Sequence, residues 1–236
     1  MARGLLALLF WLAFVPALPA ADTLVDLELV LAVDASASVD DDEFRLQLQG
    51  IAAAFRDPAV IKAISSGPAK RIAVSLLVWA EATYPKDFSG WSVLASEEDA
   101  RRFAEMAASF PRRVTGGTGL GDGIAHALRA IDGNGLVAPR SVVDVSGDGI
   151  ETAPRDYSVM LPAARAMAIA RGVTLNGLAI RNEVPDLDRY YRESLQVGPG
   201  SFVMSAATYA DFAEAMRRKL LREIDVRPSV SEAEIR

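Results

Sequence analysis

Hydrophobic residues after position 22 are grouped in short runs, separated by polar and glycine-containing segments. The segment from Asp26 to Val33 has only Asp26 and Glu28 as polar residues, a pattern typical of a strand that is buried on both faces. Runs of similar character predict further strands at Arg71–Ala80, Ser141–Val145, Val173–Ile180 and Ser201–Ser205, with a short edge strand within Tyr84–Leu94.

Between these runs, hydrophobic residues recur at intervals of three and four, which is the spacing of a helix that packs on one face. The first such stripe follows the acidic segment Asp40–Glu43 and comprises Phe44, Leu48, Ile51 and Phe55. Acidic residues stabilise the start of a helix because they face the positive end of its dipole. Further helices are predicted at Ser96–Phe110, at Ile124–Ile131, from Pro162 to the residue before Gly172, at Leu187–Leu195 and at Tyr209–Ile224.

The alternation of strands and helices predicts an α/β fold with a doubly wound, mostly parallel central sheet and helices on both faces. Nothing in the sequence between residues 22 and 226 has the composition of a linker, a repeat or a low-complexity tract. We therefore expect one domain over residues 22–226, followed by a short polar tail at residues 227–236.

The N-terminal residues have a different character. Arg3 is followed by an apolar segment from Leu5 to Val15 and then by small, turn-forming residues. This order is typical of a secretory signal peptide, which we assign to residues 1–20. An uncleaved membrane anchor is the alternative, but the apolar segment is short for a span of about 20 residues. We expect a periplasmic or secreted protein with no membrane span in the mature chain.

Composition and charge exclude several classes of protein. Hydrophobic residues make up 51% of the chain and charged residues 24%, which is typical of a folded protein with a sizeable core. The sequence contains no cysteine, so disulfides and thiolate metal sites are excluded. The net charge is −6, and it becomes −7 once Arg3 leaves with the predicted signal peptide. This negative charge argues against a nucleic-acid partner.

Three oxygen-bearing side chains follow the first predicted strand, at Asp34, Ser36 and Ser38. In open α/β sheets, ligands bind at the carboxyl ends of the strands, and residues at every second position can point to the same side. Carboxylate and hydroxyl oxygens are hard ligands that suit Mg²⁺, Mn²⁺ or Ca²⁺. The alternative interpretation is a strand-to-helix turn in which Ser38 or Asp40 caps the helix.

Two later loops carry oxygen ligands at corresponding positions. Thr118 lies within the glycine-rich segment Gly116–Gly119, which we expect to form a flexible surface loop before a helix. Asp148 follows the predicted strand Ser141–Val145, within the segment Ser146–Gly149. Each loop taken alone could be a helix cap or a turn. Because all three loops are expected at the same edge of one sheet, together they predict a common metal site.

This combination resembles the metal-ion-dependent adhesion site (MIDAS) of von Willebrand factor A (VWA) domains, which has a D-x-S-x-S motif, a threonine from a second loop and an aspartate from a third. The resemblance covers essentially the whole mature chain, because the order and number of elements also match. It implies that Ser36 and Ser38 bind a divalent cation directly, with Mg²⁺ as the first candidate. Asp34 and Asp148 would act mainly through bound waters. Thr118 would bind directly in one state and through water in another.

The resemblance also implies a partner. Ligation by neutral hydroxyls leaves the ion electron-poor, so its open position would take an anion, typically a carboxylate presented by a protein partner. The prediction is therefore an exported, non-catalytic protein-binding module. The alternatives are a periplasmic metal-dependent hydrolase and a domain that holds a purely structural ion. A hydrolase needs a general base near the metal, and the sequence offers no obvious one besides the ligands themselves.

The third loop departs from the family pattern. Its sequence is V-S-G-D-G, whereas the family commonly has Thr or Ser directly before the aspartate. Asp144, within the same predicted strand, is the competing carboxylate. We assign Asp144 to a structural hydrogen bond or salt bridge, because a residue at the end of a strand is better placed to meet a ligand.

Two other features could indicate enzyme chemistry. His126, the single histidine, would have to serve a Ser-His-Asp hydrolase, but no G-x-S-x-G motif is present. The segment Gly116–Gly123 lacks both the G-K-[ST] of a phosphate-binding loop and the G-x-G-x-x-G spacing of a dinucleotide site. The D-A-S-A-S motif also lacks the second aspartate of a D-x-D phosphotransferase. We therefore predict neither a nucleotide site nor catalytic residues.

Overall fold

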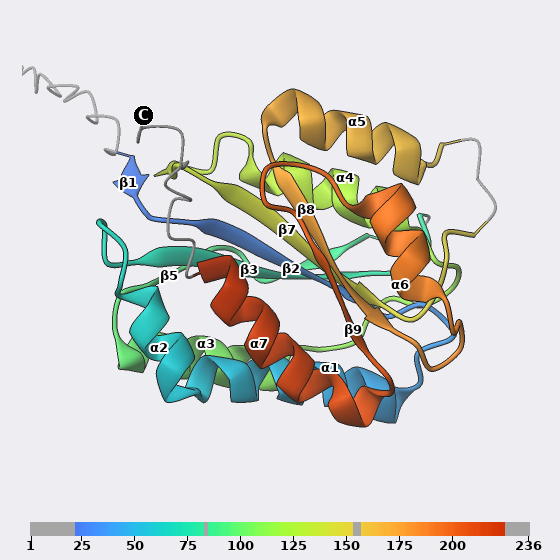
Figure 1. Ribbon diagram of the computed structural model, residues 1–236, viewed down its shortest axis with the longest axis horizontal. Helices are drawn as coiled ribbons and strands as arrows, with labels where there is room; N and C mark the ends of the chain where they lie inside the picture. The colour runs from blue at the N-terminus through green and yellow to red at the C-terminus, as the bar shows by residue number, and fades with distance from the viewer. Residues whose placement is uncertain (1–21, 83–84, 153–156, 225–236) are drawn as a thin grey trace, which may run out of the picture.

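A seven-stranded sheet forms the centre of the protein in a computed structural model that describes residues 22–82, 85–152 and 157–224 (Figure 1). The predicted signal peptide at residues 1–20 and the predicted tail at residues 227–236 lie outside these ranges. Within them, no helix has both the length and the apolar character needed to cross a membrane.

The sheet is mostly parallel, as predicted. Its strand order is β4-β3-β2-β7-β8-β9, and the short strands β4 and β5 pair with β3 in antiparallel fashion. The other pairs in this sheet are all parallel. The strands are β2 (Glu28–Asp34), β3 (Ile72–Trp79), β4 (Asp87–Phe88), β5 (Ser92–Leu94), β7 (Ser141–Gly147), β8 (Thr174–Ile180) and β9 (Val203–Ala206).

Strand β2 is buried along its whole length because both faces of the sheet are covered. Leu29, Leu31 and Val33 belong to the hydrophobic core on one face, whereas Val30 and Ala32 belong to the core on the other. This alternation follows from the two-residue period of a strand. The near-continuous apolar run in the sequence is thereby explained.

One face of the sheet packs against four helices: α1 (Asp41–Arg56), α2 (Pro58–Ile64), α3 (Glu97–Ala108) and α7 (Phe212–Ile224), which lie below the sheet in Figure 1. The acidic segment at the start of α1 forms a capping box, in which Asp40 accepts from the Glu43 amide and Glu43 accepts from the Asp40 amide. Phe55 and Phe103 join α1 to α3, with ring centroids 4.7 Å apart.

The opposite face is covered by α4 (Leu120–Ile131), α5 (Leu161–Arg171), α6 (Leu187–Tyr190) and the π-helix η1 (Tyr191–Leu195). Helix α5 has Pro162 in its first turn and ends at Gly172, whose φ of 66° is left-handed. Both termini follow the expected asymmetry, since proline fits the first turn and glycine adopts positive φ without strain.

Several elements differ from their predicted form. The predicted helix Leu187–Leu195 divides into α6 and η1, and the last helix begins with a 3₁₀ turn, η2 (Tyr209–Asp211). Helix α2 was not predicted; its N-terminus is fixed by Asp57, which accepts hydrogen bonds from two following amides. A separate two-stranded sheet, β1 (Thr23–Leu24) with β6 (Leu136–Val137), also escaped prediction because each strand is only two residues long.

The strand order places a topological switch point between β2 and β7. Strand β3 lies on one side of β2, whereas β7, β8 and β9 follow one another on the other side. The connections at the carboxyl ends of β2 and β7 therefore leave in opposite directions and open a crevice between them. Asp34 ends β2, and Asp148 directly follows β7.

Candidate metal centre

Asp34 is held at the carboxyl end of β2 by contacts to both its side chain and its backbone. Its side chain is fully buried, and Oδ1 accepts a hydrogen bond of 2.7 Å from the Ser36 amide. The carbonyl of Asp34 accepts from Gln47 Nε2 of α1 at 3.0 Å. Gln47 Oε1 in turn accepts from the Ser146 hydroxyl of β7 at 3.4 Å, so one buried glutamine links the ends of β2 and β7.

The two serines of the first motif extend from Asp34 toward the third loop. Ser36 Oγ and Ser38 Oγ are 3.2 Å apart, and Ser38 Oγ donates to Asp148 Oδ1 at 2.7 Å. Ser36 is buried, whereas Ser38 is exposed. The structure therefore brings the first and third predicted loops into direct contact across the β2/β7 crevice, and the site opens to solvent at Ser38.

Thr118 lies against the third loop, but it is not on the surface as expected. The relative exposure of Thr118 is 7%. The Thr152 amide donates to the Thr118 carbonyl at 3.1 Å, which joins the two segments. Thr118 Oγ1 is 3.3 Å from the position that a Cβ on Gly149 would take. The expectation of a surface loop is thus wrong for this side chain, and the reason is a tertiary contact between segments more than thirty residues apart.

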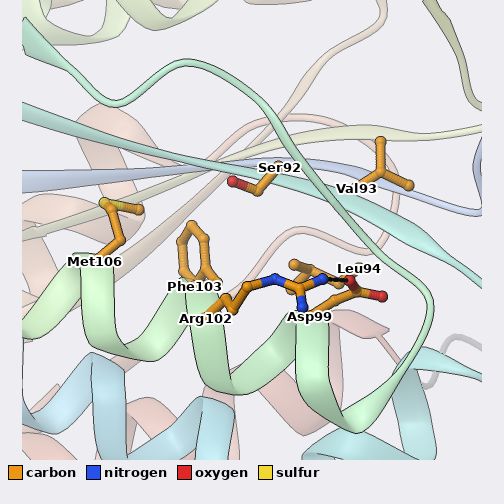
Figure 2. Close-up of a pocket in the computed structure, with 7 residues that line it drawn as sticks. All are labelled: Ser92, Val93, Leu94, Asp99, Arg102, Phe103 and Met106. Atoms are coloured by element: carbon orange, nitrogen blue, oxygen red, sulfur yellow. Dashed lines mark hydrogen bonds and ion pairs between the residues drawn. The ribbon is translucent and has the colours of Figure 1, made fainter.

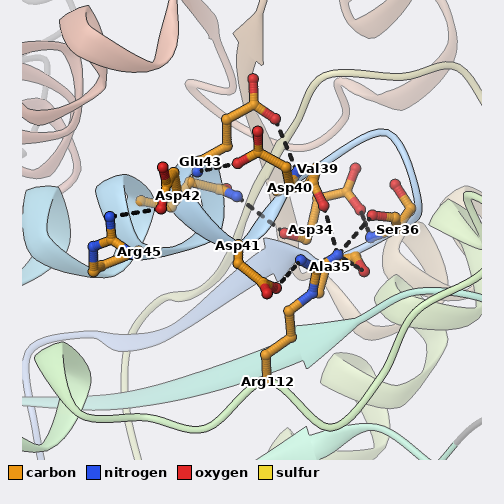
Figure 3. A network of polar contacts seen from close by, with 11 residues as sticks. Asp34, Ala35, Ser36, Val39, Asp40, Asp41, Asp42, Glu43, Arg45 and Arg112 are labelled. Atoms are coloured by element: carbon orange, nitrogen blue, oxygen red, sulfur yellow. Dashed lines mark hydrogen bonds and ion pairs between the residues drawn. The ribbon is translucent and has the colours of Figure 1, made fainter.

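Arg112 fixes the backbone of the first loop and was not identified from the sequence. Its guanidinium donates to the carbonyls of Ala35 and Ser36 at 3.3 Å and 3.2 Å, and to that of Val39. It also pairs with Asp41 at 2.8 Å (Figure 3). Because Arg112 is more than seventy residues from these partners, no local pattern in the sequence marks it.

The two carboxylates of the site have no positive counter-charge among the residues that the structure describes. Asp34 and Asp148 are both fully buried, and Oδ2 of each lacks a hydrogen-bond partner. Over the ranges that the structure describes, no basic side chain forms an ion pair with either. Burial raises the pKa of Asp34 to about 7; the Ser36 amide opposes this effect, and the charge of Asp148 adds to it.

Two uncompensated carboxylates beside three hydroxyls form a donor set that fits a divalent cation. Burying a carboxylate without a partner is costly, and a bound cation would remove that cost. All the donors are hard oxygens, which suit Mg²⁺, Mn²⁺ or Ca²⁺. In the described part of the chain, no three or more His, Cys, Asp or Glu side chains converge, so such a site depends on its hydroxyls.

Asp144 belongs to a different cluster. It lies in the middle of β7 and points to the face covered by α7, where its Oδ1 is 2.7 Å from Lys219 Nζ. Glu223 contacts the same ammonium group at 2.6 Å. The structural salt bridge that we assigned to Asp144 is therefore present, and Asp148 is the third-loop carboxylate that faces Asp34 and Ser38.

The glycine-rich segment does not present a free anion site. At the start of α4, the Gly121 amide donates to Glu151 at 2.9 Å, and the same carboxylate accepts from the Leu161 amide at the start of α5. A carboxylate from the protein thus occupies the helix N-terminus that a phosphate would need. This arrangement agrees with the absence of a nucleotide-binding motif.

His126 lies on α4, and its electrostatic neighbours are cations. Burial lowers its pKa, with further lowering by Arg129 and Lys86. In a Ser-His-Asp arrangement a carboxylate orients the imidazole and stabilises its charged form. The surroundings of His126 have the opposite sign, which supports its interpretation as an ordinary helix residue.

A separate groove lies at the other end of β3. It has a volume of about 280 Å³ and is formed by β5 and α3 (Figure 2). Arg102 and Asp99 form an ion pair on its wall, beside the ring of Phe103. Leu94 pairs with the first residue of β3, whereas Asp34 pairs with the last. The groove and Asp34 therefore lie at opposite ends of this strand.

The fold is similar to solved structures of adhesion and matrix proteins. Proximal thread matrix protein 1 from the mussel byssus matches with 15% sequence identity and a TM-score of 0.59, over 87% of this chain and 49% of that chain. A second structure of the mussel protein, with a zinc-occupied MIDAS motif, matches with 13% identity and a TM-score of 0.55, over 87% and 49% of the two chains. The pilus adhesin SpaC from Lactobacillus rhamnosus GG matches with 12% identity and a TM-score of 0.59, over 86% and 31%.

One match is to a single domain, and it covers most of both chains. The vWF domain of the type V pili tip protein Mfa5 from Porphyromonas gingivalis has 10% identity and a TM-score of 0.53, with 83% of this chain and 94% of that chain covered. This chain spans about half the length of the mussel protein and about a third of SpaC. At these identities the likeness establishes the fold, which is the predicted VWA-like α/β fold.

Comparison of the sequence, as opposed to the fold, identifies a family. No curated relative matches the sequence. One family matches residues 24–228, a range that contains every residue of the candidate metal centre. The chain therefore belongs to the family described as "Protein of unknown function (DUF1194)", and its members share with this chain the stretch of sequence that here forms a VWA-like fold.

Proposed function

We propose that this protein is an exported, non-catalytic protein-binding module that holds one divalent cation and engages an acidic group of a partner through it. The ligand set is Asp34, Ser36, Ser38, Thr118 and Asp148. The observation that carries the proposal is the pair of fully buried carboxylates, which face hydroxyls from neighbouring loops and have no basic partner in the described structure.

The arrangement of donors supports an ion with residual positive charge. Ser36 and Ser38 would bind the ion directly, with the carboxylates of Asp34 and Asp148 mainly one water away. Neutral hydroxyls donate less electron density than carboxylates, so an ion bound this way attracts an anion in its open position. Ser38 is the exposed member of the set and gives the direction from which a partner would approach.

The ion that suits this donor set best is Mg²⁺, with Mn²⁺ or Ca²⁺ as alternatives, because all the donors are hard oxygens. The zinc-occupied MIDAS motif of the mussel protein supports the use of this edge of the fold for metal binding. The adhesin and pilus-tip neighbours support a role in binding proteins.

The surface around the site limits the kind of partner. Glu43 and Asp40 lie at the start of α1, beside the site, and Glu183 lies close enough to act on Glu43. Burial raises the pKa of Glu43, with further contributions from Asp40, Asp148 and Glu183. A broadly acidic partner surface would be repelled here. Since charges are screened beyond about 8 Å at physiological ionic strength, the partner must bring one carboxylate into the coordination shell itself.

Metal binding is tested by titrating the mature chain with Mg²⁺ in a calorimeter and by melting it with and without Mg²⁺. Wild-type protein should bind one ion and melt at a higher temperature with it, because a ligand specific for the folded state stabilises that state. Asp34→Ala should bind no ion. Identical responses in the two proteins would overturn the assigned site.

Partner binding is tested by a pull-down from periplasmic extract in Mg²⁺ and in chelator. The expected result is a partner that is retained in Mg²⁺ and released by chelator. Retention that is independent of the ion would favour the structural-ion alternative. Hydrolysis of a model ester or phosphodiester that requires Mg²⁺ and Asp34 would favour the hydrolase alternative.

A further inference from the structure

Tyr191 lies next to the candidate metal centre although it comes from a distant element. It is the first residue of the π-helix η1 and is fully buried, and its hydroxyl has no hydrogen-bond partner within the described ranges. π-Helical turns are rare and occur frequently at functional sites. A buried hydroxyl without a partner is also costly, so this residue needs an explanation.

Two glycines make room for this side chain on the sheet. A Cβ on Gly177 of β8 would lie 2.7 Å from Tyr191 Cδ2, and a Cβ on Gly147 of β7 would lie 2.8 Å from the Tyr191 hydroxyl oxygen. Side chains at these positions would collide with the ring and with the hydroxyl. The aromatic side chain therefore crosses two neighbouring strands through a space that only glycine leaves open.

The hydroxyl of Tyr191 ends beside the unpaired oxygen of Asp34. The same Cβ position on Gly147 is 2.8 Å from Asp34 Oδ2 and 2.8 Å from the Tyr191 hydroxyl. Both atoms are buried, both lack a partner, and one is an acceptor whereas the other is a donor.

We propose that Tyr191 is a positioning residue of the metal centre: when the ion is bound, its hydroxyl donates to Asp34 Oδ2 directly or through one water and so orients the carboxylate toward the ion. The Ser36 amide holds Oδ1 on the other side. The proposal rests on the proposed metal-binding function. It also explains why Gly147 stands where the resembled family commonly has Thr or Ser: the Tyr191 hydroxyl occupies the adjacent space.

Removing a group that orients a metal ligand typically lowers metal affinity about 10- to 100-fold. Tyr191→Phe deletes only the hydroxyl and keeps the ring in its space between the strands. Because the hydroxyl has no partner without the ion, the metal-free melting temperature should be unchanged or slightly higher. A merely structural role predicts the reverse, namely a lower metal-free melting temperature and an unchanged Kd for Mg²⁺.

The experiment titrates wild type, Tyr191→Phe and Tyr190→Phe with Mg²⁺ alone by calorimetry and records the metal-free melting temperature of each. Tyr190 is the matched control, because it is adjacent in sequence and its hydroxyl accepts from the Glu151 amide at 3.3 Å, outside the ligand set. We expect the Kd of Tyr191→Phe to rise about tenfold or more, and that of Tyr190→Phe to stay within about twofold of wild type.

A Kd of Tyr191→Phe within about twofold of wild type would overturn this inference and leave the proposed metal site intact. Wild-type protein that binds no divalent ion would overturn both. If Tyr191→Phe does not fold, Gly177→Ala provides the second test. The three atoms nearest to its new Cβ belong to Tyr191 and Val203, with Tyr191 Cδ2 at 2.7 Å, so it displaces the ring without pressing first on Asp34. Weaker Mg²⁺ binding then supports the inference, and unchanged binding overturns it.

Discussion

Two pairs of buried carboxylates lie at or beside the central strands of this protein, and within the described residues they differ in whether a cation is paired with them. Asp144 and Glu223 share the ammonium group of Lys219, at 2.7 Å and 2.6 Å, on the face of the sheet covered by α7. Asp34 and Asp148 lie at the carboxyl edge, and the described structure holds no basic side chain against them.

The comparison shows that burial alone does not identify a metal site. Burial raises the pKa of both Asp34 and Asp144 to about 7, and in each pair the second carboxylate adds to the rise. What differs is the counter-charge. The first pair has a cation from the chain itself, with Lys219 fully buried and 5.2 Å from the ring centroid of Phe202. In the proposed function, the second pair takes a cation from solution.

The largest effect is expected from removing the internal cation. Lys219→Met leaves Asp144 and Glu223 buried together without a positive charge, which typically costs about 3–5 kcal/mol. Urea unfolding at about pH 8, above the raised pKa of about 7 of Asp144, should show this loss in the free energy of unfolding. Mg²⁺ should not restore it. A loss below about 1 kcal/mol would mean that the two clusters do not differ in the way we infer.

The next largest effect is the loss of stabilisation by Mg²⁺, which should distinguish Asp148 from Asp144. Mg²⁺ at a hundredfold excess over Kd should stabilise wild type by about 2.7 kcal/mol. Asp148→Ala should lose this stabilisation, because Asp148 belongs to the proposed ligand set. Asp144→Asn should have a lower free energy of unfolding and keep the response to Mg²⁺. If the response is lost in Asp144→Asn and kept in Asp148→Ala, the third-loop assignment is wrong.

The stabilisation of the folded protein by Mg²⁺ should depend on pH. The pKa of folded Asp34 is about 7, above its ordinary value of 3.8. Between these values the metal-free folded state keeps a proton that the unfolded state has lost, so its stability falls as pH rises through this window. A cation favours the ionised carboxylate. The rise in melting temperature with Mg²⁺ should therefore be small near pH 5 and largest above about pH 7.

Asp144 provides the control for this measurement. Its pKa is also raised to about 7, so it contributes to the same fall in metal-free stability. Lys219 occupies its cluster, however, and no divalent cation is needed there. Asp34→Ala should abolish the Mg²⁺ response at every pH, whereas Asp144→Asn should retain the response and its pH dependence. A Mg²⁺ effect of equal size across this pH range would contradict the proposed role of Asp34.

The smallest effect on stability is expected at Thr118. Thr118→Ala removes one hydroxyl from a side chain that is 7% exposed, and the cost should be at most about 1.5 kcal/mol. The retention of a partner found by pull-down should fall sharply, since the hydroxyl belongs to the proposed ligand set. Thermal melting and the pull-down are measured on the same preparation. Full partner retention in Thr118→Ala would show that this residue is not a ligand.

The local part of the site was predictable from spacing. Asp34, Ser36 and Ser38 are contiguous with a recognisable buried strand, so their placement at its carboxyl end follows from the hydrophobic pattern. Thr118 and Asp148 were placed at the same edge by the rule for ligand sites in α/β sheets. The structure brings Asp148 to Ser38 and Thr118 to Gly149, which agrees with that placement.

Residues that act over long separations were not predictable. Arg112 binds the first loop across more than seventy positions, and the Tyr191 hydroxyl lies near Asp34 only because the side chain packs over two glycines of the sheet. Lys219 belongs to an amphipathic helix, in which a lysine is ordinarily expected at the surface. Its complete burial depends on α7 lying over Asp144. No local pattern contains this information.

The sequence by itself determined the alternation of strands and helices, the burial of β2 on both faces and the three loops that carry oxygen ligands. These features follow from hydrophobic periodicity and from the order of elements, which are local properties of a chain. Only the tertiary structure decided which buried carboxylate has a resident cation. Asp144 and Asp148 are four residues apart in the same segment, yet one faces Lys219 and the other faces Asp34, because Asp144 lies within β7 beneath α7 whereas Asp148 lies beyond the carboxyl end of the strand.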